Sequence, residues 1–235
     1  MDHDAVATGP ITGISSMATR HVLNELVDGY ARQCGQQVLI ESVGGVDAAR
    51  RVAAGEPFDF VVLASDAIDR LAQTGRVEAD GRVDLVRSKV AVAVANGAPH
   101  PDVHSEAAIR QAVLGARSLG YSTGPSGAHI VALFERWGIA EAIAPRIVKA
   151  PPGTPVGTLI ERGEVELGFQ QLSELIGLPG IDVVGVLPRE IEAVTVFAAA
   201  ICVTSKRRDA TRALLSFLAA PEGDAIKQRY GMEAA

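Results

Sequence analysis

The chain has 235 residues, a formal net charge of −6, and 48% hydrophobic but only 4% aromatic residues. This composition predicts an ordinary globular protein with an aliphatic core, folded as one large domain or two small lobes. An acidic chain without a basic run is a poor partner for nucleic acid or an anionic membrane. A small anion remains a suitable ligand, because local dipoles rather than net charge decide such binding.

Neither a secretory signal nor a membrane span is predicted. MDHDAVATGP at the start lacks a basic region and an apolar region, and no run reaches the roughly 20 apolar residues that a span needs. With Met1 as the natural start, we expect a cytoplasmic protein; removal of an upstream leader would instead make it periplasmic. Cys34 and Cys202 form no CxxC pair, so we expect structural cysteines and neither a metal nor a cofactor.

The first third of the chain alternates strand and helix signals. Strands are predicted over 11–15, 38–42 and 58–65, and helices to about 33, over 47–54 and over 66–73. Repeated strand–helix units predict a parallel sheet with crossover helices.

Two long extended runs, 85–96 and 194–205, bracket the middle of the chain. Between them we expect helices over 105–114, up to 137 and within 154–163, and strands ending at 121, 150 and 170. The fold class is therefore α/β with mostly parallel sheets in two lobes, of residues 1–85 plus 196–235 and of 86–195. The extended runs would be hinge-crossing strands, and a ligand cleft would lie between the lobes. One continuous doubly wound domain is the alternative.

Four strand-to-helix turns share a character that suits a small anion: ISSMAT, SVGGVD, YSTGPSGA and APPGTPVG. Each would offer a helix N-terminus with unpaired N–H donors at the carboxyl end of a strand. For a single turn, an ordinary N-cap or turn glycine is the alternative. The predicted ligand-binding residues of these turns are Ser15, Ser16, Gly44, Gly45, Ser122, Thr123, Ser126, Gly127 and Gly153.

A few other side chains could bind or react with such an anion. Arg20, one turn into the first helix, could hold a carboxylate, and Gln170 and Gln171 could recognise one without charge. The alternatives are a solvated helix face for the arginine and a helix cap for the amides. The candidate acid/base groups are His129, Glu41 and Tyr121, with His129 ranked first because it opens the helix after the third turn.

The order of several blocks resembles the periplasmic molybdate-binding proteins of ABC transporters. These blocks are ITGISSMAT, VLIESVGG, GEPFDFVVLASDAIDRL, YSTGPSGAHIVALFERWGI and RGEVELGFQQLSEL. The resemblance covers nearly the whole chain and implies a type II periplasmic-binding-protein fold, with the ligand between two lobes.

The molybdate ligands of that family do not carry over. The resemblance places its first hydroxyl position near Ala18, its second at Gly44 or Gly45, and its tyrosine at Gln171. Only contacts near Ser126 and Gly153 remain, so the resemblance implies the fold without the specificity for molybdate.

The chain is also similar in architecture to the aconitate isomerases, cofactor-free enzymes of the same fold group. This resemblance implies polycarboxylate binding and a proton shift along a double bond. We therefore expect a small-anion protein that leans towards an isomerase. The alternative is a solute-binding protein for a molybdate-like oxyanion or a carboxylate, serving transport or sensing, with a transporter partner only if it is exported.

Overall fold

The computed structural model describes residues 9–151 and 153–235, which form two compact units. Unit 1 comprises the chain up to Arg87 together with Val196–Ala235, and unit 2 comprises Ser88–Thr195. A ligand cleft between the lobes stays a prediction. Within the described ranges, no helix is both long enough and apolar enough to cross a membrane.

In unit 1 the strands lie in the order β2-β1-β3-β9, with β1, β2 and β3 parallel and β9 antiparallel to β3. Short 3-10 turns, η1 (Met17–Thr19) and η4 (Pro221–Gly223), precede α1 and α10. The other elements are β1 (Ile11–Ser16), α1 (Arg20–Cys34), β2 (Val38–Val43), α2 (Gly45–Ala53), β3 (Phe60–Ala64), α3 (Ser65–Gln73), β9 (Val194–Ile201), α9 (Arg208–Ala219), α10 (Asp224–Arg229) and β10 (Met232–Ala234).

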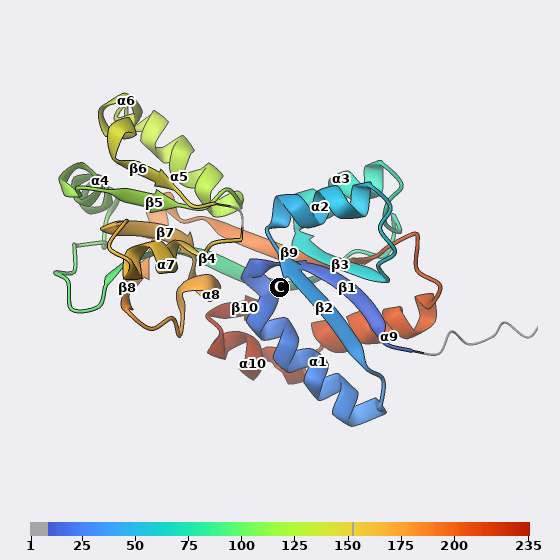
Figure 1. Ribbon diagram of the computed structural model, residues 1–235. Coiled ribbons are helices and arrows are strands. Elements are labelled where there is room, and N and C mark those ends of the chain that lie inside the picture. Colours follow the sequence, from blue (N-terminus) through green and yellow to red (C-terminus); the bar gives the residue numbers. More distant parts are fainter. Residues whose placement is uncertain (1–8, 152) are drawn as a thin grey trace, which may run out of the picture. The chain divides into compact units, whose positions relative to one another are not determined.

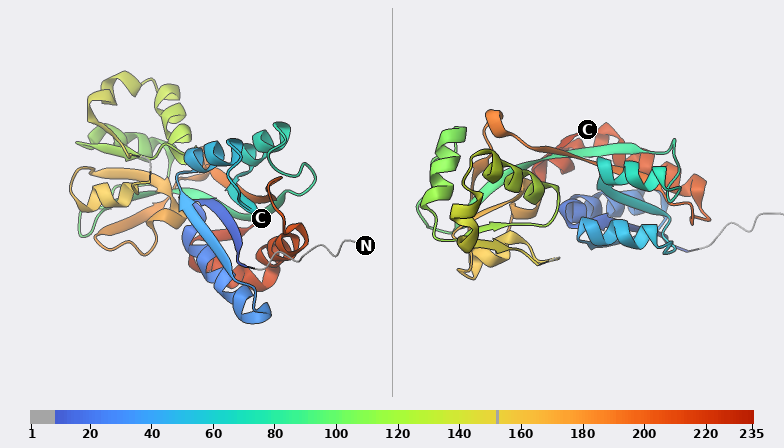
Figure 2. Two further views of the ribbon diagram at one scale, coloured as in Figure 1. Left: turned by 45° about the vertical axis from the view of Figure 1, so that its right-hand side comes forward. Right: turned by 90° about the horizontal axis from the view of Figure 1, so that it is seen from above.

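Strand β3 shows how this sheet separates two apolar layers. Phe60 and Val62 pack in the cluster with α1 and α9, whereas Val61 and Leu63 pack in the cluster with α2 and α3. Successive side chains of a strand point to opposite faces, so helices cover the sheet on both sides (Figures 1 and 2). Such a doubly covered strand is a continuous apolar run, which is why FVVLA could be recognised in the sequence.

Unit 2 repeats this plan with the strand order β8-β4-β7-β5-β6. Its strands β5, β6 and β7 are mutually parallel where they pair, and β4 runs antiparallel to β7 and β8. Helices α4 and α5 cover one face and α7 and α8 the other. The elements are β4 (Val83–Ala95, which enters from unit 1), α4 (Glu106–Gly115), β5 (Leu119–Tyr121), α5 (Pro125–Arg136), α6 (Ala140–Ile143), η2 (Ala144–Arg146), β6 (Ile147–Lys149), α7 (Val156–Glu161), β7 (Leu167–Gln171), α8 (Leu172–Leu175), β8 (Ile181–Val186) and η3 (Arg189–Ile191).

The α/β class and the alternation of strands and helices match the sequence prediction, with local differences. The run predicted over 194–205 is too long, because β9 ends at Ile201 and the chain then turns, with the N–H of Ser205 donating to the Cys202 carbonyl. Strand β8 and strand β10 were not predicted. Most of β8 is only partly buried, so it lacks the apolar run or strict alternation that identifies a strand.

Candidate functional site

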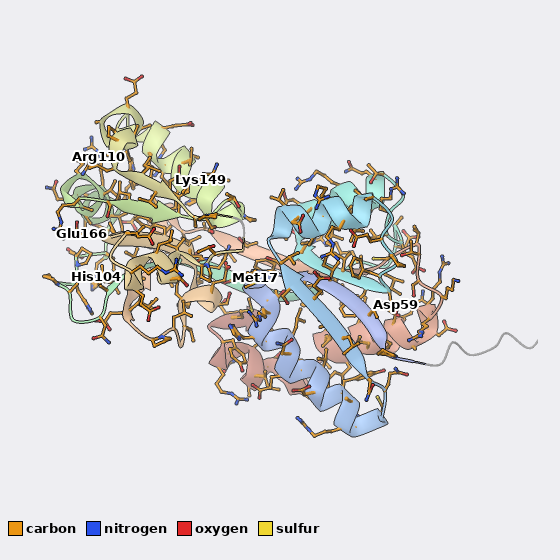
Figure 3. The ribbon with its side chains drawn as sticks, in the orientation of Figure 1. Met17, Asp59, His104, Arg110, Lys149 and Glu166 are labelled. Atoms are coloured by element: carbon orange, nitrogen blue, oxygen red, sulfur yellow. The ribbon has the colours of Figure 1, made fainter. Side chains whose placement is uncertain are left out.

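The carboxyl ends of β1, β2 and β3 lie at one edge of the unit 1 sheet, because the three strands are parallel. Met17 marks this edge in Figure 3, and Asp59, just before β3, marks the opposite one. The first two predicted turns therefore come together. Ser15 Oγ lies 2.9 Å from Ser42 Oγ, which joins the end of β1 to that of β2.

The two serines of the first turn differ in their availability to a ligand. Ser15 is fully buried, whereas Ser16 is partly exposed and its Oγ accepts a 3.4 Å hydrogen bond from the Ala18 N–H. A Cβ placed on Gly45 would lie 3.6 Å from Ser16 Oγ, so the second turn touches the first. The Ser16 hydroxyl is therefore accessible to a ligand at this edge. Its N-cap role uses one acceptor site of the hydroxyl, and its O–H donor stays available.

Arg20 is the first residue of α1 and its side chain is exposed. Among the described residues it makes no ion pair or hydrogen bond through its guanidinium. It follows η1 directly, one turn beyond Ser16. An unpaired guanidinium keeps all five donors for an incoming carboxylate.

Glu41 lies within β2 rather than at its end, and its carboxylate is taken by Arg51 of α2. The two guanidinium–carboxylate distances are 2.5 and 2.9 Å. The hydrogen bond from Arg51 lowers the pKa of Glu41 below its ordinary value. This pairing makes Glu41 a weaker base than the sequence suggested, because α2 returns along the sheet and brings Arg51 to it.

The third predicted turn joins β5 to α5 in unit 2. Its Ser122 and Ser126 hydroxyls lie 3.1 Å apart, Thr123 is exposed, and Gly124 caps α5. A Cβ on Gly127 would lie 1.7 Å from the Ser122 carbonyl oxygen, so only glycine allows the turn to fold back onto the helix. The first turn of this 12-residue helix keeps N–H groups without intrahelical partners.

Tyr121 ends β5 just before this turn, whereas His129 lies one turn into α5 and does not open the helix as predicted, because the helix begins at Pro125. Burial raises the pKa of Tyr121, whose ring meets Phe134 edge-on in the core at 6.3 Å between centroids. Tyr121 is therefore neutral at pH 7 and suits an acid rather than a base. His129 Nε2 lies 2.9 Å from the Ile191 carbonyl, which can only accept, so Nε2 carries the hydrogen. That bond leaves Nδ1 as the ring nitrogen that is available to a ligand.

The fourth predicted turn precedes α7. Residue 152 lies outside the described residues; Gly153 has a φ of +80° and open space around it. The N–H of Val156, the first residue of α7, donates to Gln170 Oε1 at 2.7 Å. Gln170 therefore has the helix-capping role that was the alternative to ligand binding.

Gln171 differs from its neighbour in having an unsatisfied atom. The residue is 2% exposed, and its Nε2 donates to Thr195 Oγ1 at 2.7 Å. Its Oε1 is buried without any hydrogen-bond partner among the described residues. Because strand side chains alternate, Gln171 and Phe169 lie on the same face of β7, and Phe169 packs in the cluster with α5. A buried polar atom without a partner costs about 1–3 kcal/mol. A ligand carboxylate would recover this cost with the Gln171 amide rotated, so that Nε2 donates to the ligand and Oε1 accepts from the Thr195 hydroxyl.

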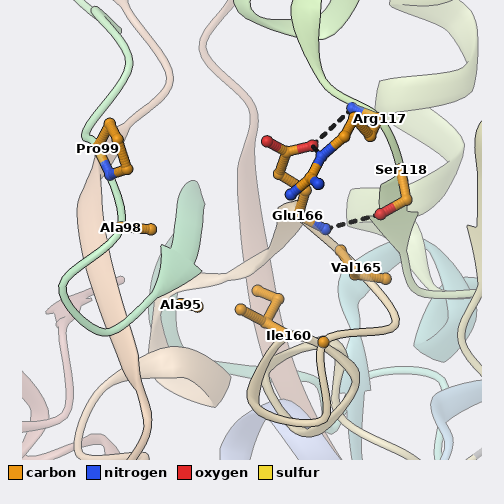
Figure 4. Close-up of a pocket in the computed structure, with 9 residues that line it drawn as sticks. Ala95, Ala98, Pro99, Arg117, Ser118, Ile160, Val165 and Glu166 are labelled. Atoms are coloured by element: carbon orange, nitrogen blue, oxygen red, sulfur yellow. Dashed lines mark hydrogen bonds and ion pairs between the residues drawn. The ribbon is translucent and has the colours of Figure 1, made fainter.

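A pocket of about 420 Å³ lies at the opposite edge of the unit 2 sheet, before β5 and β7 (Figure 4). Its polar groups satisfy one another. Glu166 accepts from the Arg117 backbone N–H at 2.6 Å, and its own N–H donates to Ser118 Oγ at 2.9 Å. With these groups paired, the pocket is a weaker ligand site than the turns at the carboxyl edge.

Some residues of these edges were not singled out from the sequence. Ser42 lies in the second turn, and its contact with Ser15 follows from the parallel register of β1 and β2. Glu174 of α8 and Thr195 of β9 contact Gln170 and Gln171, respectively. No motif marks them, since these contacts depend on tertiary packing.

The fold of this chain defines a class of protein. The Azotobacter vinelandii periplasmic molybdate-binding protein superposes with a TM-score of 0.79 at 19% identity, covering 94% of this chain and 98% of that one. The sulfate-binding protein SubI of Mycobacterium tuberculosis superposes with a TM-score of 0.76. The fold is the periplasmic-binding-protein fold of type II, as the sequence predicted.

Sequence comparison gives the family. Residues 11–233 match the bacterial extracellular solute-binding proteins, and the chain belongs to that family. It is 36% identical to the aconitate isomerase of a Pseudomonas species over 229 residues, 95% of this chain and 87% of the relative. It is 20% identical to the molybdate-binding protein ModA of Escherichia coli, over 95% of this chain. The predicted resemblance to both groups is confirmed.

Proposed function

We propose that this protein binds a small polycarboxylate through the turns at the carboxyl edges of its sheets and isomerises it, as an aconitate isomerase does. The observation that carries the proposal is the 36% identity to such an enzyme along 95% of the chain. The donors at these edges are hydroxyls and helix-start N–H groups, which suit carboxylate oxygens. The Gln171 amide adds a donor when it is rotated so that Nε2 faces the ligand and Oε1 accepts from Thr195. Arg20 adds the one positive charge that the sequence predicts for the site.

The proposed reaction is a proton shift that needs no redox partner. A base removes a proton from the methylene carbon beside a carboxylate, the double bond migrates, and a proton returns to the former vinyl carbon. We assign the base to His129 Nδ1, since Glu41 is occupied by Arg51 and Tyr121 is neutral. Hydrogen-bond donors at helix starts would stabilise the enolate-like charge that develops.

Binding without turnover is the second candidate, and membership of the solute-binding family favours it. A thermal-shift series with molybdate, sulfate, citrate, cis-aconitate and trans-aconitate separates the candidates, because a ligand of the folded state raises the Tm. We expect shifts with the tricarboxylates and then a cis–trans absorbance change in the same samples. A shift without turnover would make the protein a carboxylate-binding protein, and a shift with molybdate alone would refute the polycarboxylate proposal.

Arg20→Ala should weaken trans-aconitate binding by about 10- to 100-fold, the worth of a charge-assisted hydrogen bond. The affinity for molybdate, if it binds, should fall by a smaller factor. Arg32→Ala is the matched control, because Arg32 is an exposed arginine near the other end of α1. Titration calorimetry measures both variants. Equal affinities for Arg20→Ala and the parent protein would remove Arg20 from the site.

Gln171→Leu should lower tricarboxylate affinity at least 10-fold while leaving the ligand-free protein as stable as before, or up to about 1 kcal/mol more stable. The substitution removes an amide NH₂ that can donate to a carboxylate after rotation, and it removes a buried oxygen that has no partner without ligand. Urea unfolding with and without trans-aconitate measures the two effects. A destabilised ligand-free protein with unchanged affinity would show that Gln171 has only a structural role.

A further inference from the structure

Glu174 is an acidic residue beside the fourth turn that the proposed reaction does not use. It is partly buried in α8, which follows β7 without a break. Its Oε1 accepts a hydrogen bond from Gln170 Nε2 at 2.8 Å. Within the described ranges no Lys, Arg or His forms an ion pair with it. A carboxyl group in such a place costs stability, and no salt bridge accounts for its presence.

Gln170, the partner of Glu174, also contacts the backbone at the start of α7. Gln170 is 2% exposed, and its Oε1 accepts from the Val156 N–H at 2.7 Å. Val156 is fully buried at the start of α7, so this N–H has no intrahelical acceptor and no access to water. One side-chain amide thus links the carboxyl group on α8 to the backbone of α7.

The two partners select the same orientation of the Gln170 amide. The Val156 N–H can only donate, so it requires the amide oxygen. An ionised carboxylate can only accept, so it requires the amide NH₂. With Glu174 present, the amide is held at both ends. With an apolar side chain there, the NH₂ would lose its partner, and rotation of the amide would place a donor against the Val156 N–H.

We propose that Glu174 is a positioning residue that, through Gln170, holds the backbone at the start of α7 in the conformation that receives the ligand. The turn that contains Gly153 leads directly into Val156. A fixed Val156 fixes the end of that turn. The ligand role of the turn rests on the proposed function, whereas the Glu174–Gln170–Val156 linkage is independent of it.

The test compares Glu174→Leu, Glu174→Gln, Gln170→Leu and the double variant Glu174→Leu/Gln170→Leu. Hydrogen exchange of the segment 153–161 reports the start of α7 in the absence of ligand. We expect about 10-fold faster exchange in Glu174→Leu, in Gln170→Leu and in the double variant. The effects of the two single substitutions should not add, because both residues act through the same hydrogen-bonded linkage. Glu174→Gln keeps an acceptor for Gln170 and should restore protection. Glu161→Leu, an exposed α7 position, is the control.

Calorimetry with trans-aconitate then measures the consequence for binding. We expect about 10-fold weaker affinity in Glu174→Leu and recovery of most of it in Glu174→Gln, with far-UV circular dichroism confirming that each variant is folded. Unchanged exchange in folded Glu174→Leu would overturn the proposal, as would faster exchange with unchanged affinity. If the parent protein does not bind trans-aconitate, the proposed function fails, and the exchange experiment still decides the role of Glu174.

Discussion

Gly127→Ala should destabilise the protein by about 3 kcal/mol or more, at the upper end of what overpacking usually costs. The added methyl group would lie 1.7 Å from the Ser122 carbonyl oxygen, and 2.8 Å from its carbon. Both are backbone atoms, so no side-chain rotation relieves the overlap. The turn at the start of α5 would have to open, and Ser122 and Ser126 would lose their 3.1 Å contact.

Gly124→Ala is the matched control in the same turn. Its φ of −84° suits any residue, and the nearest atom to an added Cβ is Ser122 Oγ at 3.9 Å. We expect a change within about 0.5 kcal/mol, as at most unstrained positions. Urea unfolding of both variants measures the difference. Similar stabilities for the two alanine variants would show that Gly127 does not approach the Ser122 carbonyl this closely.

The stabilising effect of Glu174→Gln on the free energy of unfolding should be about 3 kcal/mol larger at pH 8 than at pH 4. Burial raises the pKa of Glu174 from its ordinary value of 4.5 to about 7, although the hydrogen bond from Gln170 opposes this shift. The folded state therefore binds the proton more tightly than the unfolded state. The parent protein loses stability as the pH rises from about 4.5 to 7, and the full loss is present above 7. Glutamine does not ionise, so it avoids this loss.

Melting temperatures of the two proteins between pH 4 and pH 8 test this expectation, since other titrating groups contribute equally to both. The difference in Tm between Glu174→Gln and the parent protein should grow between pH 4.5 and 7 and reach roughly 5–10 °C, given the usual relation between stability and Tm. Glu161→Gln, at an exposed position of α7, should follow the parent curve. Parallel curves for Glu174→Gln and the parent would contradict a raised pKa.

Much of the fold was predictable because strands buried on both faces form apolar runs. FVVLA of β3 and the helices after it follow from pattern alone. Strand β8 did not, because partial burial along its length removes the periodic signal, and the four-residue helix α8 is too short to show one. The positions of the candidate turns were also predictable, since they follow the carboxyl ends of parallel strands.

The roles of individual side chains were harder to predict. Glu41 was expected to be available as a base, but its partner Arg51 is ten residues away on a helix that returns over the sheet. Gln170 and Gln171 are adjacent and chemically identical. One is satisfied at both ends and the other has an unpaired oxygen, since they point to opposite faces of β7. Sequence alone does not give this difference, because it arises from what packs on each face.

The division of the chain between the units has a consequence for synthesis on the ribosome. Unit 2 is one continuous stretch, whereas unit 1 is completed only by residues 196–235, which supply most of β9 and all of α9. Strand β3 needs β9 as its antiparallel neighbour. The second unit can therefore finish folding while the first still waits for its last strand. Until then β3 has an open, apolar edge, the kind of edge that pairs with other chains.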